Sequence, residues 1–111
     1  MAEYGEWNRK GATLSDVTAK AEYGVEWDFI VKGIEAQQLE YREGVIWGNP
    51  YLRILRSQLE KYIAQELGED YLVKAKAQTE LRSIKKEIAE LQKRLNQLQN
   101  RKHDLEKSLK E

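Results

Sequence analysis

A regular apolar repeat in the last third of the chain constrains the fold more than any other feature of the sequence. The repeat alternates steps of four and three residues, and Lys102 is the one position that interrupts it. Its apolar members are Ala77, Leu81, Ile84, Ile88, Leu91, Leu95, Leu98, Leu105 and Leu109. Such a pattern, sustained over about four heptads with charged flanks, indicates a helix that pairs through a coiled-coil seam. We therefore predict that residues 69–111 form a dimerisation helix, with the leucines and isoleucines from Leu81 to Leu109 in the seam.

The partner and the direction of this pairing stay open at the level of sequence. A helix of this length would extend roughly 60 Å, and its stripe needs a partner, most simply a second copy of the chain. With Leu81 and every seventh residue after it as the a positions, a parallel pair would bring Glu80 near Lys85 and Arg101 near Glu106. An antiparallel pair would bring Glu80 near Arg101 and Glu87 near Arg94. The order of the charges favours the antiparallel pair slightly, and Lys102 in the seam could set the register or the oligomer number.

Composition separates this helix from a smaller globular part. All three Trp, the single Pro and all seven Gly lie at or before Gly68, and Lys, Glu, Gln, Leu and Arg dominate the rest. We therefore expect an N-terminal arm at residues 1–12, a domain at 13–68 and the coiled coil at 69–111. The chain has no Cys, no apolar run of the roughly 20 residues that span a bilayer, and no secretory signal pattern at its start. A cytoplasmic protein without membrane contact is expected.

Two short helices are expected at the start of the domain. Thr13 and Ser15 precede a segment with Val17 and Ala21 on one face, and Gly24 is a typical left-handed helix end. A second helix begins at about Glu26 and carries a buried face made of Phe29, Ile30, Ile34 and then Leu39. Gly33 within it would permit close packing on the first helix.

A hairpin and a third helix are expected to follow. Residues 39–43 and 51–55 alternate apolar and polar side chains, and Gly44, Gly48, Asn49 and Pro50 lie between them. Ser57 and Glu60 have the spacing of a capping box, in which each side chain bonds the other residue's backbone amide. The third helix would bury Leu59, Tyr62, Ile63 and Leu67.

This order of elements resembles the excisionase-like and MerR-type winged helix-turn-helix families. The resemblance covers about half the chain, from Leu14 to Ile63, and lies in Gly24-Val25, the second helix with Leu39, and residues 51–60. It implies a mainly α fold with a small β-hairpin, and a double-stranded DNA partner. The groove-facing residues would be Trp27, Asp28, Val31, Lys32 and Glu35, and Arg42, Arg53 and Arg56 would lie near phosphates. Such a protein would be a transcriptional regulator or a phage-type adaptor.

Charge favours a different class of function. Residues 1–68 hold eleven acidic and eight basic side chains, a net charge of −3, whereas DNA binding depends on cations that displace counterions from phosphates. The alternative is a non-enzymatic protein-interaction or structural module built from the same head and coiled coil. It would bind a protein through Trp27, Val31 and Trp47. Val45, Ile46 and Trp47 at the hairpin tip could form an apolar contact, although a Trp there more often folds back over its own hairpin.

Catalysis is not expected. His103, the only histidine, lies on the charged helix beside Asp104, and Glu69 and Asp70 fit the first turn of a helix. The sequence has no Gly-rich phosphate loop, nucleophile elbow or zinc-ligand spacing. We expect neither an enzyme nor a metal or organic cofactor.

Overall fold

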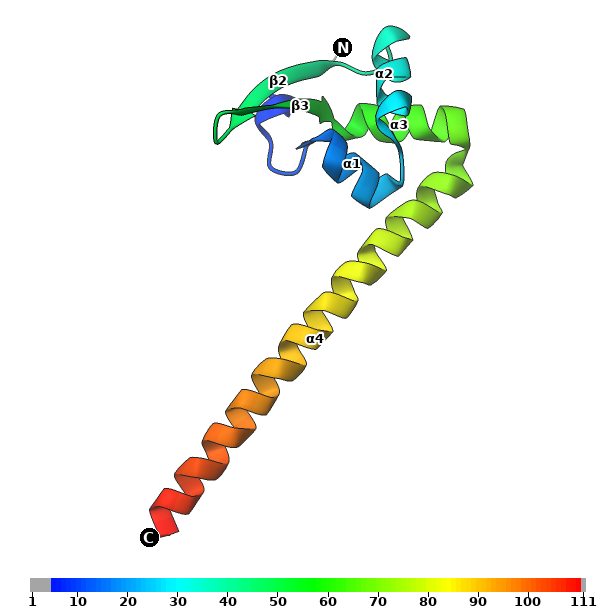
Figure 1. Ribbon diagram of the computed structural model, residues 1–111. Helices are drawn as coiled ribbons and strands as arrows, with labels where there is room; N and C mark the ends of the chain where they lie inside the picture. Colours follow the sequence, from blue (N-terminus) through cyan, green and yellow to red (C-terminus); the bar gives the residue numbers. More distant parts are fainter. Residues whose placement is uncertain (1–4, 111) are drawn as a thin grey trace. The chain divides into compact units, whose positions relative to one another are not determined.

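The computed structural model of the protein describes residues 5–110, except for the side chains of Ile46 and Asn49. The elements, in chain order, are η1 (Glu6–Asn8), β1 (Thr13–Leu14), α1 (Asp16–Tyr23), α2 (Trp27–Glu35), β2 (Tyr41–Ile46), β3 (Asn49–Leu55), α3 (Arg56–Leu67) and α4 (Glu69–Lys110) (Figure 1). The protein is therefore mostly helical with one small antiparallel sheet, which confirms the predicted fold class at that level. Contacts within the chain define two compact units, Met1–Thr79 and Glu80–Glu111.

Helix α1 has the predicted ends but a different buried face. The Ser15 hydroxyl accepts a hydrogen bond from the Thr18 amide at 3.2 Å, and Gly24 ends the helix with a φ of 72°. Ala19 and Tyr23 are buried, however, whereas Val17 is 73% exposed and Ala21 is also exposed. The predicted face was wrong because the large ring of Tyr23 buries more apolar area than Val17 could, and the helix turns that side inward.

Helix α2 begins and packs as predicted, apart from the role of its glycine. Ile30 is fully buried, and Phe29 and Ile34 pack against the core from partly buried positions. A Cβ atom on Gly33 would lie 2.6 Å from Leu39 Cδ1 and 2.9 Å from Tyr62 Cε2. Gly33 therefore permits a close approach to the following turn and to α3, and the expectation that it packs on the first helix was wrong.

The sheet has the order β1-β3-β2, with both pairings antiparallel. The β2–β3 hairpin is longer than predicted, because Gly44 and Pro50 lie in its strands instead of in the turn. Gly44 pairs with Tyr51, and Pro50 pairs with Val45. The turn is Trp47-Gly48, and φ values of 53° and 82° identify it as type I′. Gly44 fits inside β2 because the ring of its cross-strand partner Tyr51 covers it, at 2.6 Å from where a Cβ atom would lie.

Helix α3 follows β3 directly, without the predicted capping box. Its N-cap is Leu55, which makes no side-chain capping bond. The Ser57 hydroxyl instead donates to the buried Glu6 carboxylate, and Glu60 accepts from the Tyr23 hydroxyl. The capping-box prediction was wrong because both side chains form tertiary hydrogen bonds. Leu59, Tyr62 and Ile63 are buried as predicted, whereas Leu67 is 45% exposed.

Helix α4 confirms the predicted long C-terminal helix. Its first turns belong to the first unit, where Leu72 packs on the core, the Tyr71 hydroxyl donates to the Tyr23 carbonyl at 2.7 Å and the Thr79 hydroxyl donates to the Glu22 carbonyl at 2.6 Å. In the second unit the leucines and isoleucines of the seam are exposed, from 44% at Ile84 to 86% at Leu109. The second unit thus presents one apolar stripe, interrupted at Lys102.

Candidate nucleic-acid interface

The outward face of α2 carries the residues expected to face a DNA groove. Trp27 is 50% exposed, Asp28 and Lys32 are exposed, and Val31 is half-buried. Glu35 extends the same face and is exposed. The face is therefore accessible and mixed in charge, with one cation between two carboxylates. Nearby, Lys20 is in an ion pair with Glu26 at 3.3 Å.

Arg56 lies in a network inside the head rather than on an open surface. Its Nε donates to the Gly11 carbonyl at 2.9 Å, and its Nη1 donates to the Tyr23 hydroxyl at 2.8 Å and to Glu22 Oε1 at 3.0 Å. Its Nη2 donates to the other Glu22 oxygen at 3.3 Å. Hydrogen bonding to Glu22 is the main reason that the pKa of Arg56 is raised. These contacts connect the loop before β1, helix α1 and helix α3, so Arg56 serves as an internal clamp and few of its donors remain for a phosphate.

Tyr23 joins this network to α3. Its hydroxyl donates to the Glu60 carboxylate, whose second oxygen lies 3.4 Å from Lys76 Nζ. Burial, followed by the hydrogen bond to Glu60, raises the pKa of Tyr23 to about 12, although Arg56 acts in the opposite direction. Tyr23 therefore stays neutral over the physiological range and acts as a hydrogen-bond bridge.

Arg42 and Arg53 gather around a tryptophan that sequence reasoning missed. Trp7, in the segment expected to be an arm, is only 7% exposed. The Arg42 guanidinium carbon lies 4.5 Å from the centroid of its ring, and that of Arg53 lies 6.0 Å away. Arg53 also donates to the Trp7 carbonyl at 2.8 Å. The sequence signal that could have predicted the burial of Trp7 was the ring itself, because a tryptophan in a short polar segment has a large apolar area to bury.

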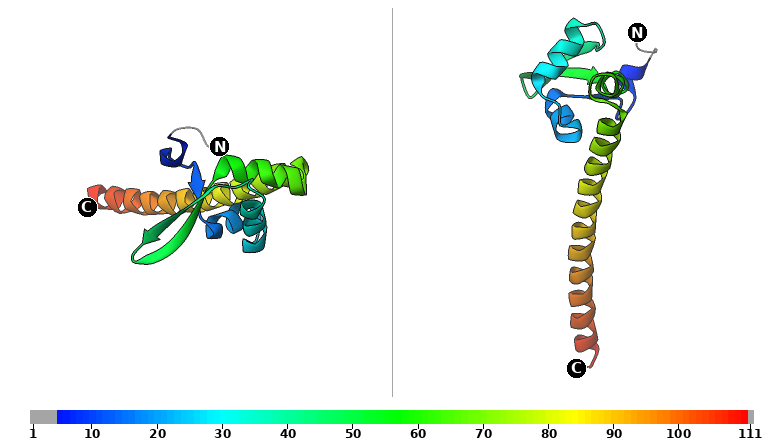
Figure 2. Two further views of the ribbon diagram at one scale, coloured as in Figure 1. Left: turned by 90° about the horizontal axis from the view of Figure 1, so that it is seen from above. Right: turned by 90° about the vertical axis from the view of Figure 1, so that its right-hand side faces the viewer.

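The hairpin separates these two arginines from the core. Arg42 and Arg53 are direct cross-strand partners, so their side chains project from the same face of the sheet. Leu52 and Ile54, which alternate with Arg53 along β3, pack with the core that includes Ile30 of α2. Figure 2 shows the N-terminal segment on the opposite side of β3 from α1 and α2.

The expected phosphate-binding cations therefore occupy separate environments. Lys32 lies on α2, Arg42 and Arg53 surround Trp7, and Arg56 is held in the internal network. The structure brings Arg42 and Arg53 together as cross-strand partners. It does not place Arg56 with them.

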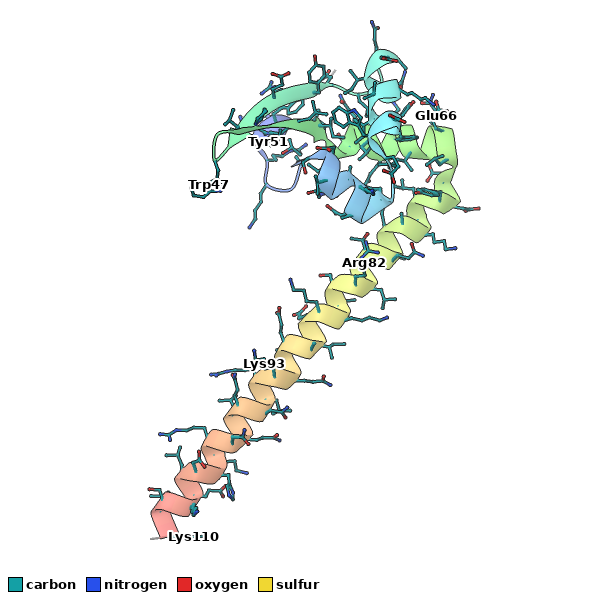
Figure 3. The ribbon with its side chains drawn as sticks, in the orientation of Figure 1. Trp47, Tyr51, Glu66, Arg82, Lys93 and Lys110 are labelled. Atoms are coloured by element: carbon teal, nitrogen blue, oxygen red, sulfur yellow. The ribbon has the colours of Figure 1, made fainter. Side chains whose placement is uncertain are left out.

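The hairpin tip carries the most exposed large hydrophobic side chain among the described residues of the head. Trp47 is 96% exposed and projects from the turn (Figure 3), and neighbouring Val45 is 69% exposed. The expectation that Trp47 folds back over its own hairpin was wrong, because a ring packed on the strands could not be almost fully exposed. The side chain of Ile46, the third residue of the expected apolar tip, lies outside the described residues.

Within residues 5–110, no group of three or more His, Cys, Asp and Glu side chains could hold a metal ion. No helix in the same range is both long and apolar enough to cross a membrane. Comparisons with protein-family models, curated proteins and solved structures found no match to this chain.

Proposed function

We propose that the head is a winged helix-turn-helix that binds double-stranded DNA, and that the coiled-coil segment joins two such heads. The observation that carries this proposal is the local arrangement of α1, a three-residue connection at 24–26, α2 with an exposed outer face, and the β2–β3 hairpin that follows. In the winged families that the sequence resembles, the second helix enters the major groove and the hairpin touches the backbone. Since a fold alone does not establish a function, the proposal depends on the side chains that α2 and the hairpin present.

Helix α2 would read the groove. Lys32 would contact a phosphate or a guanine edge, and Asp28 would accept a hydrogen bond from the amino group of a cytosine. Trp27 and Val31 would supply apolar contact. These four residues and Glu35, the groove-facing set expected from the sequence, lie on one accessible face.

The hairpin arginines would contribute positive charge from the wing, on the face of the sheet opposite α2. Arg42 is exposed and Arg53 is half-buried, and Trp7 holds both guanidinium groups in place. Arg56 has another role in this proposal: it orders α1 and the start of α3 through Glu22 and Tyr23, and it acts on DNA only by positioning.

The exposed stripe of α4 supports a dimer. Leaving eight leucine and isoleucine side chains 44% to 86% exposed on one helix is unfavourable, and pairing two stripes removes this apolar area from water. Replacing Ile88 and Leu95 with Lys should yield monomers in analytical ultracentrifugation. The matched control places Lys at the neighbouring outward positions, Ala89 and Asn96, and should remain dimeric. A dimer that persists in the seam variant would refute this assignment.

The DNA-binding test is fluorescence anisotropy of a labelled random duplex at about 50 and then 200 mM salt. We expect binding that weakens steeply with salt, and a several-fold loss of affinity for Lys32→Glu. Lys61→Glu is the matched control, because it makes the same charge change at an exposed position of α3. No binding at the lower salt, or equal losses for the two variants, would reject α2 as the DNA-binding element.

A protein partner at the hairpin tip is the second candidate function. The observation in its favour is that Trp47 is almost fully exposed next to Val45, because large aromatic side chains are enriched among residues that dominate protein interfaces. If the duplex does not bind, the test is cross-linking through a photoreactive group placed at Val45. A partner that Trp47→Ala loses and Lys61→Glu retains would support this function.

A further inference from the structure

The stripe of α4 carries one further inference, which rests on the proposed pairing of two chains. We propose that two copies of residues 77–109 pair in antiparallel orientation, with Lys93 at the centre of the pair. The occupant of the exposed stripe is thus a second copy of the same segment, in the reverse direction.

Lys102 is the main argument for this orientation. It occupies a seam position, seven residues after Leu95 and seven before Leu109, on a helix that continues to Lys110. In a parallel pair in register, each seam residue faces its own copy, so two Lys102 ammonium groups would share one apolar layer. In an antiparallel pair centred on Lys93, Lys102 faces the partner's Ile84. The two ammonium groups then lie about 27 Å apart along the axis, at 1.5 Å per residue.

The proposed register also uses the whole stripe. Leu81 faces the partner's Leu105, Ile88 faces the partner's Leu98, and Leu91 faces the partner's Leu95. At the ends, Ala77 faces the partner's Leu109. A shift by one heptad toward the N-terminus would instead place Leu105 against the partner's Lys74 and Leu109 against the partner's Asp70. Among antiparallel registers, therefore, only the one centred on Lys93 gives every seam leucine an apolar neighbour.

The flanking charges give both attractive and repulsive contacts in this register. Glu80 and Glu87 lie on one flank of the first half of the stripe, and Arg94 and Arg101 continue that flank in the second half. Reversing one helix brings Glu87 nearest the partner's Arg101, but it also brings Arg94 close to the partner's Arg94 at the centre of the pair. On the other flank, Lys85 comes nearest the partner's Gln99, and the partner's Glu106 lies about 7.5 Å away along the axis. A parallel pair would also bring opposite charges together on its flanks, so the seam lysine decides the orientation.

The test measures distances between spin labels on the full chain. The sequence has no Cys, so Lys93→Cys and Lys107→Cys each give a single labelling site. Both positions lie on the side of the heptad opposite the seam, which leaves the interface intact. In the antiparallel pair the two Lys107 labels are 28 residues apart along the axis, about 42 Å. The two Lys93 labels lie at the same level along the axis, on opposite outer faces of the pair, roughly 20 Å apart. In a parallel pair both distances are short.

A long Lys107 distance together with a short Lys93 distance supports the proposal. Short distances at both positions overturn the orientation, and a long distance at Lys93 overturns the register. Lys102→Leu should add a short component at Lys107, because it removes the charge that opposes parallel pairing. If the labelled protein sediments as a dimer and binds duplex yet gives a short Lys107 distance, the orientation fails and the proposed function stands. A protein that sediments as a monomer removes the proposed dimer itself.

Discussion

Replacing the tryptophan of the hairpin turn should stabilise the head. Trp47 occupies the first central position of a type I′ turn with a φ of 53°, where Asn and Gly are favoured. A left-handed conformation disfavours a residue with a bulky side chain by about 1–2 kcal/mol, and Asn tolerates it better than most residues. Because Trp47 is 96% exposed, its removal forfeits almost no buried area. Trp47→Asn should therefore raise the free energy of unfolding by about 1 kcal/mol.

This gain can be measured by thermal unfolding at a fixed protein concentration, because dimerisation makes Tm depend on concentration. A gain of about 1 kcal/mol raises Tm by roughly 4–8 °C in a domain of this size. Trp47→Ala is the matched control: it also removes the ring, but Ala lacks the tolerance of Asn for this conformation, so its Tm should change less. If the Asn variant is no more stable than the Ala variant, the turn is not strained and the reasoning is refuted. A stabilised variant that also loses a binding activity would indicate that the strain at Trp47 is retained for function.

Two further predictions concern the core of the head. The pKa of Tyr23 is raised from about 10 to about 12, so its contribution to stability is complete below pH 10 and is lost as pH rises toward 12. The difference in urea-unfolding free energy between the wild type and Tyr23→Phe should shrink over that window, and a constant difference would contradict the assignment. Gly33→Ala gains up to about 1 kcal/mol of helix propensity but forces a methyl group against the buried side chains of Leu39 and Tyr62, at about 1–3 kcal/mol. We expect a lower urea midpoint, and an increase would show that these two side chains shift aside easily.

Local signals predicted much of this fold. Ser15 and Gly24 define the ends of α1 because a capping hydroxyl and a left-handed glycine act within one turn of the helix. The apolar spacing of Phe29, Ile30 and Ile34 likewise predicted the buried side of α2. The heptad predicted the long helix, since its period extends over the whole segment.

Tertiary contacts explain what the sequence did not predict. Ser57 and Glu60 have the spacing of a capping box, yet their side chains bond Glu6 and Tyr23, from segments far away in the chain. Trp7 was assigned to an arm because its cover, two arginines of the hairpin, cannot be seen from neighbouring residues. Prediction of the candidate site from the sequence was limited for the same reason. The sequence identified the arginines that could bind phosphates, but it could not show that Arg56 is already hydrogen-bonded within the head.

The internal contacts of the head also bear on why a DNA-binding head would need a partner. With Arg56 in its own network, Lys32, Arg42 and Arg53 are the cations of the predicted set that one head can offer, about three phosphate contacts. Since the logarithm of affinity falls with slope of about −0.9 per contact, one head should lose roughly 40-fold in affinity between 50 and 200 mM salt. Two heads, with about six contacts, should lose roughly 2,000-fold. The Ile88→Lys, Leu95→Lys variant should therefore bind duplex more weakly and with about half the salt slope of the wild type. An unchanged slope would mean that each head binds alone, and that the coiled coil serves some purpose other than DNA affinity.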